Sequence, residues 1–551
     1  MLPGESDNGS GRVNTNVRQW LTETSPGGDQ SKQVQNEAPE SQKALIVFEH
    51  EVSHTLMERM LKISSLDNMQ RDIFSTQAFT PLPPRGEVYT LVEEFFVNSN
   101  SMVPLYHRPT FMRFLELHYS GDFDGGSGWW ACLNAMLASS YRMRSSKPRK
   151  HLFVTNENEI KASAYIKNAL SVYPDLSMVN VDIFSAQALI TMAKYFTAEA
   201  NYRHSTAFVD AAFRILHSIG LHKAKQDQSI SLVEMEQRRR IFWIAYAFDK
   251  EFSLRSGRPS MQLDEDAEVD LPSEVPSHPM GCATYNSGLV PRGAEFIVFR
   301  GTCALALVKS KIYKRLYSAS SWKKTEEEVL QTVAELEKEL DQWKSSLPYA
   351  LHPDHSFGHL PDRMLMFTMS MRFAYYHCVM VLHRRLWAYH RVENKSPSSV
   401  QSSTAALSPQ MSRSAESCVQ AARQSIQLLR EVPRGYGGFH IFVLYYAASS
   451  YNILFAHVLQ NPQGPFFRAD LERMRSAQQF AQNAVSGDED DQLNADINKL
   501  ISVMDGCERI LLNMQEGTHR EYYPPEADED FLSRSMLHFQ NGIMSHPGLG
   551  F

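Results

Sequence analysis

Three consecutive arginines, Arg238, Arg239 and Arg240, could contact the phosphates of nucleic acid or act as a nuclear import signal. Glu234 lies four residues before Arg238, and Glu236 lies four residues before Arg240. In a helix, residues at this spacing are neighbours, and each such ion pair stabilises the helix by a few tenths of a kcal/mol. We therefore expect two of the arginines to be paired inside the protein and one to face solvent.

A second charged group, Asp264, Asp266 and Glu268, could suggest calcium binding. A calcium-binding EF-hand loop needs glycine at its sixth position and glutamate at its twelfth. Counted from Asp264, both positions hold valine here, which excludes such a loop. We expect instead a hydrogen-bonded loop whose acids pair with Arg255 or Arg258.

His107 could serve as a base or as a metal ligand. It stands directly before Arg108 and Pro109, with no partner acid close by in the sequence, which favours a hydrogen-bonded histidine in a turn. The sequence also lacks the short motifs of phosphate-binding loops, dinucleotide sites, zinc proteases and serine hydrolases. We predict that the chain is not an enzyme and has no catalytic, cofactor-binding or metal-binding residue.

A helix must position the arginines, because the residues after them are apolar at the spacing of one helical face. Trp243 and Tyr246 widen this face, so little of the helix would meet water. Gly257 supplies a permissive turn residue, and Pro259 keeps Arg258 out of helical conformation. The pattern predicts a buried helix that ends in a polar loop. The residues of the apolar face are Ile241, Ile244, Ala245, Phe248 and Phe252.

The whole stretch resembles the middle homology region of fungal-specific transcription factors. Members of that family commonly carry an acid before a run of arginines, then Ile-Phe-Trp, a Tyr and an Asp, and later Gly-Arg-Pro and an Asp-x-Asp ahead of Leu-Pro. Two more blocks fit the family, His107 to Phe111 and Leu216 to His222, whereas Leu382 to Arg385 is a weaker match. The resemblance covers roughly residues 88–390. The matching residues of the main stretch are Glu236, Arg238 to Arg240, Ile241 to Trp243, Tyr246, Asp249, Gly257 to Pro259, Asp264, Asp266 and Leu271-Pro272.

The resemblance implies a nuclear transcriptional regulator that controls a metabolic or biosynthetic gene set. Such a regulator would act through other regulators, a coactivator or a small-molecule effector. Helical periodicity along the chain, without a run of alternating strands, predicts an all-α fold of packed antiparallel helices. Two alternatives stay open: a helical small-molecule sensor or interaction scaffold without DNA binding, and an enzyme that uses the same scaffold.

The usual DNA reader of this family is a binuclear zinc cluster, which needs six cysteines within about thirty residues. The six cysteines here lie far apart, and none precedes Cys132. Zinc is therefore expected only if an N-terminal cluster is missing from this sequence, and we expect DNA binding to be weak or to go through a partner. The net charge of -7 gives the chain as a whole no electrostatic footprint for nucleic acid. Cysteines so spread indicate reduced, mostly buried thiols.

Composition and the resemblance together divide the chain into five parts. Residues 1–43 are polar and are expected to be disordered. The middle homology region follows at 44–390, with its core at 88–276. A Ser-rich linker or insertion occupies 391–414, and further helices at 415–515 pack on the same body. Residues 516–551 mix acids with aromatics, as in a segment that docks on a coactivator, although a solvated tail fits equally well.

Phe439 to Leu459 is uncharged and long enough to cross a membrane. It contains His440, Asn452 and His457, which are expensive in lipid and ordinary in a protein core. We expect a buried helix and no membrane partner.

Overall fold

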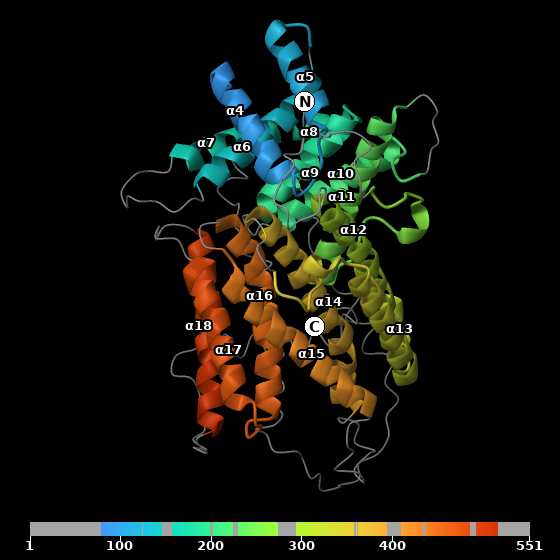
Figure 1. Cartoon of the computed structure of the whole chain (residues 1–551), viewed down its shortest axis with the longest axis vertical. Helices are drawn as coiled ribbons and strands as arrows, with labels where there is room; N and C mark the ends of the chain where they lie inside the picture. The colour runs from blue at the N-terminus through green and yellow to red at the C-terminus, as the bar shows by residue number, and fades with distance from the viewer. Residues whose placement is uncertain are drawn as a thin grey trace, which may run out of the picture. The chain divides into compact units, whose positions relative to one another are not determined.

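Every regular element that the structure describes is a helix. The computed structural model describes residues 79–123, 125–145, 157–198, 202–223, 230–273, 294–357, 360, 362–393, 409–433, 437–484 and 492–515. Within these ranges no strand occurs, and the prediction of an all-α fold is confirmed (Figure 1).

Helix α6 is the centre of the N-terminal group of helices. It packs against α4, α7 and α9, and α9 packs in turn against α10. A buried amide pair fastens α6 to α7, because Asn168 Nδ2 donates to Asn134 Oδ1 at 2.9 Å. The elements of this group are α4 (Arg85–Phe95), the π-helix η1 (Phe96–Asn100), α5 (Arg108–Ser120), α6 (Gly126–Ser145), α7 (Glu157–Ser171), α8 (Tyr173–Met178), α9 (Ile183–Thr197) and α10 (Tyr202–Ser218).

Helix α11 joins this group to the helices that follow, since both α10 and α12 pack on it. Helix α13 begins with a capping box formed by Thr325 and Glu328. The residues of its apolar seam are buried inside the protein: Val329, Val333, Leu336, Leu340 and Trp343. The elements are α11 (Leu232–Ser256), the 3-10 turn η2 (Asp264–Asp266), α12 (Ala294–Ile312), the π-helix η3 (Tyr313–Tyr317), the 3-10 turn η4 (Ala319–Lys323), α13 (Glu326–Ser345) and the 3-10 turn η5 (Tyr349–Leu351).

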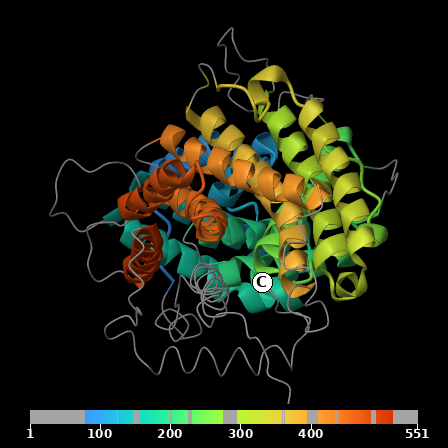
Figure 2. The same cartoon turned by 90° about the horizontal axis from the view of Figure 1, so that it is seen from below.

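The remaining helices pack in sequence. Helix α14 packs on α12 and α13, α15 packs on α14 and α16, and α17 contacts both α16 and α18. The orange and red helices α15 to α18 lie together in the second view (Figure 2). Arg423 of α15 makes a two-point ion pair with the buried Asp470 of α17, at 2.9 and 2.7 Å. The elements are α14 (Asp362–Glu393), α15 (Pro409–Leu428), the 3-10 turn η7 (Leu429–Glu431), α16 (Gly437–Gln460), α17 (Phe467–Ala484) and α18 (Gln492–Gln515).

Two of these helices are long and apolar enough to cross a membrane, namely Met364–Leu386 and Gly438–Gln460. In the structure 78% and 89% of their apolar windows are buried by other helices. Such burial is typical of core helices, as the sequence predicts for the second of them.

The described cysteines are all buried and unpaired with one another: Cys132, Cys303, Cys378, Cys418 and Cys507. Burial raises the pKa of each of these thiols, to about 12 for Cys378, Cys418 and Cys507. The prediction of reduced, buried thiols is confirmed for these five residues.

Several sequence-based predictions fall outside the described residues. These are the disordered segment at 1–43, the acidic and aromatic tail at 516–551, and most of the Ser-rich range at 391–414. Helix occupies both ends of that range, because α14 reaches Glu393 and α15 begins at Pro409.

Candidate functional site

Helix α11 carries the motif and has a defined cap at each end. The Ser231 side chain accepts the backbone N–H of Glu234 at 3.2 Å, which satisfies one of the free donors of the first turn. Gly257 ends the helix in the left-handed region, with φ of 66°. Ile241, Ala245 and Tyr246 are buried between these caps. The predicted buried helix is confirmed, with bounds Leu232–Ser256.

All three motif arginines are paired within the helix. Arg238 contacts Glu234 at 2.8 Å, and Arg239 and Arg240 each contact Glu236 at 2.9 Å. Arg240 is fully buried beneath the Phe296 ring, with the guanidinium 4.6 Å from the ring centre. The two predicted (i, i+4) pairs are confirmed. We expected two paired arginines and one facing solvent; instead all three are paired, because Glu236 lies on the helix face between Arg239 and Arg240 and binds both, while Arg238 is the most exposed of the three.

The same Glu236 fastens the end of the following loop to the helix. Its Oε1 accepts the backbone N–H of Ser273 at 3.1 Å. Nearby, the indole N–H of Trp243 donates to the carbonyl of Asp270 at 2.7 Å, and Arg300 donates to the carbonyl of Pro272 at 2.6 Å. Polar atoms of the motif thus hold residues 270–273 against α11 and α12.

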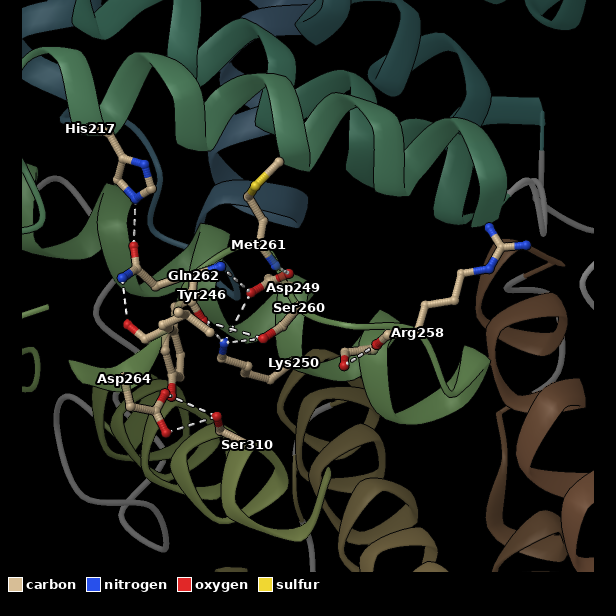
Figure 3. A network of polar contacts seen from close by, with 12 residues as sticks. His217, Tyr246, Asp249, Lys250, Arg258, Ser260, Met261, Gln262, Asp264 and Ser310 are labelled. Carbon is tan, nitrogen blue, oxygen red and sulfur yellow. Dashed lines mark hydrogen bonds and ion pairs between the residues drawn. The ribbon is translucent and has the colours of Figure 1, made fainter. Parts of the chain in front are cut away.

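Asp249 holds the first part of that loop (Figure 3). Its two carboxylate oxygens accept the backbone N–H groups of Met261, at 2.8 Å, and Gln262, at 3.2 Å. Lys250 lies 3.1 Å from the same carboxylate and also donates to Ser260 Oγ at 2.8 Å and to the carbonyl of Gln262. Both side chains are buried. A buried carboxylate that is paired and hydrogen-bonded in this way has a structural role.

Asp264 and Asp266, the paired acids of the motif, have different environments. The Tyr246 hydroxyl donates to Asp264 Oδ1 at 2.6 Å, and Ser310 Oγ of α12 lies 2.9 Å from both of its oxygens. Burial, and then the Asp264 charge, raise the pKa of Tyr246 far above its ordinary value, so it stays a donor. Asp266 is exposed. The predicted hydrogen-bonded loop is confirmed for Asp264, whereas the predicted pairing of these acids with Arg255 or Arg258 is wrong.

Arg258 is the motif residue whose side chain points away from this network (Figure 3). It is exposed, and among the described residues no ion pair joins it to a carboxylate. Its backbone is fixed on both sides. Its carbonyl accepts Ser253 Oγ at 2.6 Å, its N–H donates to Ser256 Oγ at 3.4 Å, and Gly257 and Pro259 flank it. The turn therefore presents a guanidinium to solvent from an ordered backbone.

The His107 block has a structural explanation as well. His107 stands at the N-cap of α5 with Pro109 in the first turn, and its Nδ1 lies 2.7 Å from Thr110 Oγ1. Arg108 makes a two-point contact with Glu93 of α4, one arm at 3.0 Å. The prediction of a hydrogen-bonded turn histidine is confirmed.

Sequence reasoning missed a second buried charged cluster at the end of α11. Glu251 accepts Arg255 Nε at 2.5 Å, the Tyr446 hydroxyl of α16 at 2.7 Å, and the ammonium of Lys309 on α12. Burial alone would raise the pKa of Glu251, but Lys309 and Arg255 outweigh it and hold that pKa well below its usual range. The sequence signal was the acid at 251 four residues before the arginine at 255, which is the same spacing as in the arginine run.

The described residues do not fit the binuclear zinc cluster that members of this family usually carry. Their five cysteines lie on different helices, and no group of three or more His, Cys, Asp or Glu residues in the described ranges could hold a metal ion.

Comparison with known proteins identifies the domain. Residues 92–345 match the family described as the fungal specific transcription factor domain. This match places a fungal specific transcription factor domain at residues 92–345. This range contains both the His107 block and the whole motif helix with its loop, so the recognition made from those residues is confirmed. It ends at the last residue of α13, earlier than the resemblance alone suggested.

Three proteins that are similar to this chain are named as transcription factors. An ABC-transporter-regulating transcription factor of Aspergillus fumigatus is 39% identical over 457 residues, which are 82% of this chain and 49% of that protein. A protein of the same name from Aspergillus oryzae is 39% identical over 80% of this chain and 48% of its own length. A fusaridione A cluster transcription factor of Fusarium heterosporum is 29% identical over 72% of each chain. The chain spans about half the length of the two Aspergillus relatives.

Proposed function

We propose that this chain is the regulatory body of a nuclear transcriptional regulator of the fungal type, and that it controls a metabolic or biosynthetic gene set. The observation that carries the proposal is the match of residues 92–345 to the fungal specific transcription factor domain. The names of two relatives support the kind of target, since one is said to regulate an ABC transporter and another a fusaridione A gene cluster.

The chemistry of the motif favours regulation through partners over direct reading of DNA. Protein–DNA affinity comes mainly from arginine and lysine side chains that are free to contact phosphate. Arg238, Arg239 and Arg240 each contact a glutamate within their own helix, and Arg240 is fully buried. The run is therefore used for folding. We propose that the described helices bind other regulators, a coactivator or a small-molecule effector, and reach DNA through a partner.

A reporter assay tests the regulatory part of the proposal. The full chain is fused to a heterologous DNA-binding domain and directed to a promoter with the matching sites. We expect reporter expression to change relative to the DNA-binding domain alone. The matched control is the fusion with Glu236→Ala, which keeps the length and surface of the chain but removes the acid that holds the loop. An equal reporter level from all three proteins at equal abundance would contradict the proposal.

A gel-shift titration with the purified chain tests the part about DNA. We expect weak binding that falls steeply with salt and does not depend on sequence. Tight, sequence-selective binding at moderate salt would overturn the indirect route. Locating a tagged copy in fungal cells separates the proposal from its alternative, a helical sensor or scaffold without DNA binding. The regulator accumulates in the nucleus, and the scaffold does not.

A further inference from the structure

The last turn of α11 is joined to α16 by one buried arginine. Arg255 is 3% exposed, and its guanidinium lies among the rings of α16 and α10. The distances from its central carbon to the ring centres are 4.4 Å for Tyr445, 4.5 Å for Tyr446, 4.9 Å for Phe442 and 5.3 Å for Tyr202. Three of these four rings belong to α16, and each cation–π contact of this kind is favourable when desolvated.

Helix α16 also contacts the backbone of that turn. The Tyr445 hydroxyl donates to the carbonyl of Arg255 at 3.4 Å and lies 3.2 Å from His377 Nε2 of α14. The Tyr446 hydroxyl donates to Glu251, the acid that binds Arg255. Tyr445 therefore contacts Arg255 directly, through its backbone carbonyl. Tyr446 contacts it indirectly, through the Glu251 carboxylate that pairs with the Arg255 guanidinium.

This junction leaves some of its hydrogen bonds unmade. Arg255 Nη2 and His377 Nδ1 are buried and have no hydrogen-bond partner among the described residues. A buried polar cluster with unmade bonds is held less firmly than a fully satisfied one or an apolar core of the same size. The two unmade bonds therefore lower the free-energy cost of opening the junction, relative to one in which every bond is made.

The bend that follows lies directly downstream of the junction. Arg255 is two residues before Gly257, and the bend continues through Arg258 to the amides of Met261 and Gln262, which Asp249 of α11 holds. The backbone of Arg258 depends on Ser253 and Ser256 in the same last turn of α11. A change in that turn is expected to move the bend, because the hydrogen bonds of Ser253 and Ser256 to the Arg258 backbone start in that turn.

We infer that Arg255 is a latch through which α16 sets the conformation of the Gly257–Gln262 bend and the presentation of the exposed Arg258. With Tyr445 and Tyr446 seated on Arg255 and Glu251, the turn is fixed and Arg258 projects to solvent. When α16 shifts, the last turn of α11 loosens and the bonds from Asp249 to the bend are lost. The latch crosses the boundary of the matched domain, because residues 92–345 contain α11 and exclude α16. It does not depend on the proposed function.

Hydrogen exchange read by mass spectrometry tests the latch in the full chain. Tyr445→Phe and Tyr446→Phe each remove one hydroxyl from α16, a change mild enough to leave the fold intact by circular dichroism. We expect both to speed amide exchange in residues 257–262 by about tenfold or more, although these amides are far from the changed residues in sequence. Arg255→Met is expected to have the larger effect, and Arg255→Lys an intermediate one.

Tyr451→Phe is the matched control. Tyr451 is on the same helix and equally buried, but its hydroxyl donates to the carbonyl of Met504 in α18, at 2.7 Å. This variant is expected to speed exchange in α18 and leave the bend unchanged. The inference is overturned if Tyr445→Phe and Tyr446→Phe affect α16 alone, or if Tyr451→Phe speeds exchange in the bend as much as they do.

Discussion

The carboxylate of Glu236 accepts the backbone N–H of Ser273 at 3.1 Å, although the two residues are 37 positions apart. This bond brings the start of the motif next to its end. The acid, the arginines, the tryptophan and the Leu-Pro pair therefore form one closed unit, in which a loop is folded back on the helix that precedes it. A substitution in the arginine run acts on stability first, because the run holds this unit together.

Glu236→Ala tests how much that carboxylate contributes. The change removes the carboxylate that pairs with the fully buried Arg240, and loss of one side of a buried ion pair typically costs about 3 kcal/mol or more of unfolding free energy. Glu234→Ala is the control, since its side chain is 47% exposed and its pair with Arg238 is worth at most about 0.5 kcal/mol. Urea unfolding at neutral pH measures both. Equal midpoints for the two variants would contradict the assignment.

Asp249→Asn keeps the shape of the side chain and removes its charge. The buried Lys250 then loses its counter-charge, and an amide NH2 must face one of the backbone N–H donors of Met261 or Gln262. We expect a loss of about 3 kcal/mol. Asp266→Asn, in the same loop but exposed, should change stability by less than about 0.5 kcal/mol. Thermal unfolding of the two variants and of the parent chain measures both changes in stability, and equal losses in the two variants would contradict the role given to Asp249.

Gly257→Ala tests the end of α11. A Cβ in the left-handed region costs about 1 kcal/mol or more, so this variant should unfold at a lower temperature than the parent. Gly86→Ala makes the same chemical change in α4, where φ is not positive and no atom lies within 4 Å of the added Cβ. We expect it to be neutral, or stabilising by up to about 1 kcal/mol. A stabilising effect at position 257 would rule out the left-handed cap.

Acid should destabilise the chain through two buried histidines. Burial lowers the pKa of His377 to about 3 and that of His383 to about 4. In the unfolded chain both have an ordinary pKa near 6.5, so between these values the unfolded state binds more protons. The two neutral histidines contribute their full stability above about pH 6.5. As the pH decreases below this value, the free energy of unfolding decreases by up to about 1.4 kcal/mol per pH unit for each histidine.

The measurement is urea unfolding from pH 7 to pH 5.5, above most of the range in which ordinary carboxylates titrate. His377→Gln and His383→Gln should each flatten the pH dependence. His355→Gln is the control, because its ring is stacked on the exposed Tyr349 and is only partly buried. A slope unchanged in both buried variants would show that other groups take up the protons.

The sequence predicted those features that depend on short spacing. The helix, its glycine cap and the pairs of Glu234 and Glu236 with arginines four residues on are all set by neighbours along one helix. The network of Asp249, Lys250 and Gln262 could not be predicted, because the loop must first fold back on the helix. The predicted acid partner of Arg255 was wrong although a local signal existed, since its carboxylate is that of Glu251, four residues earlier in the same helix. The contacts of this pair with Tyr445 and Tyr446 could not be predicted, because α16 lies about 190 residues further along.

The burial of the five described cysteines has a practical consequence. A maleimide or disulfide reagent reacts with an accessible thiolate, and these thiols are both enclosed and hard to ionise. Labelling at Cys303, Cys378 or Cys507 must therefore wait for the helix around it to open. Because these residues lie on α12, α14 and α18, the order in which they become labelled reports which helices come apart first.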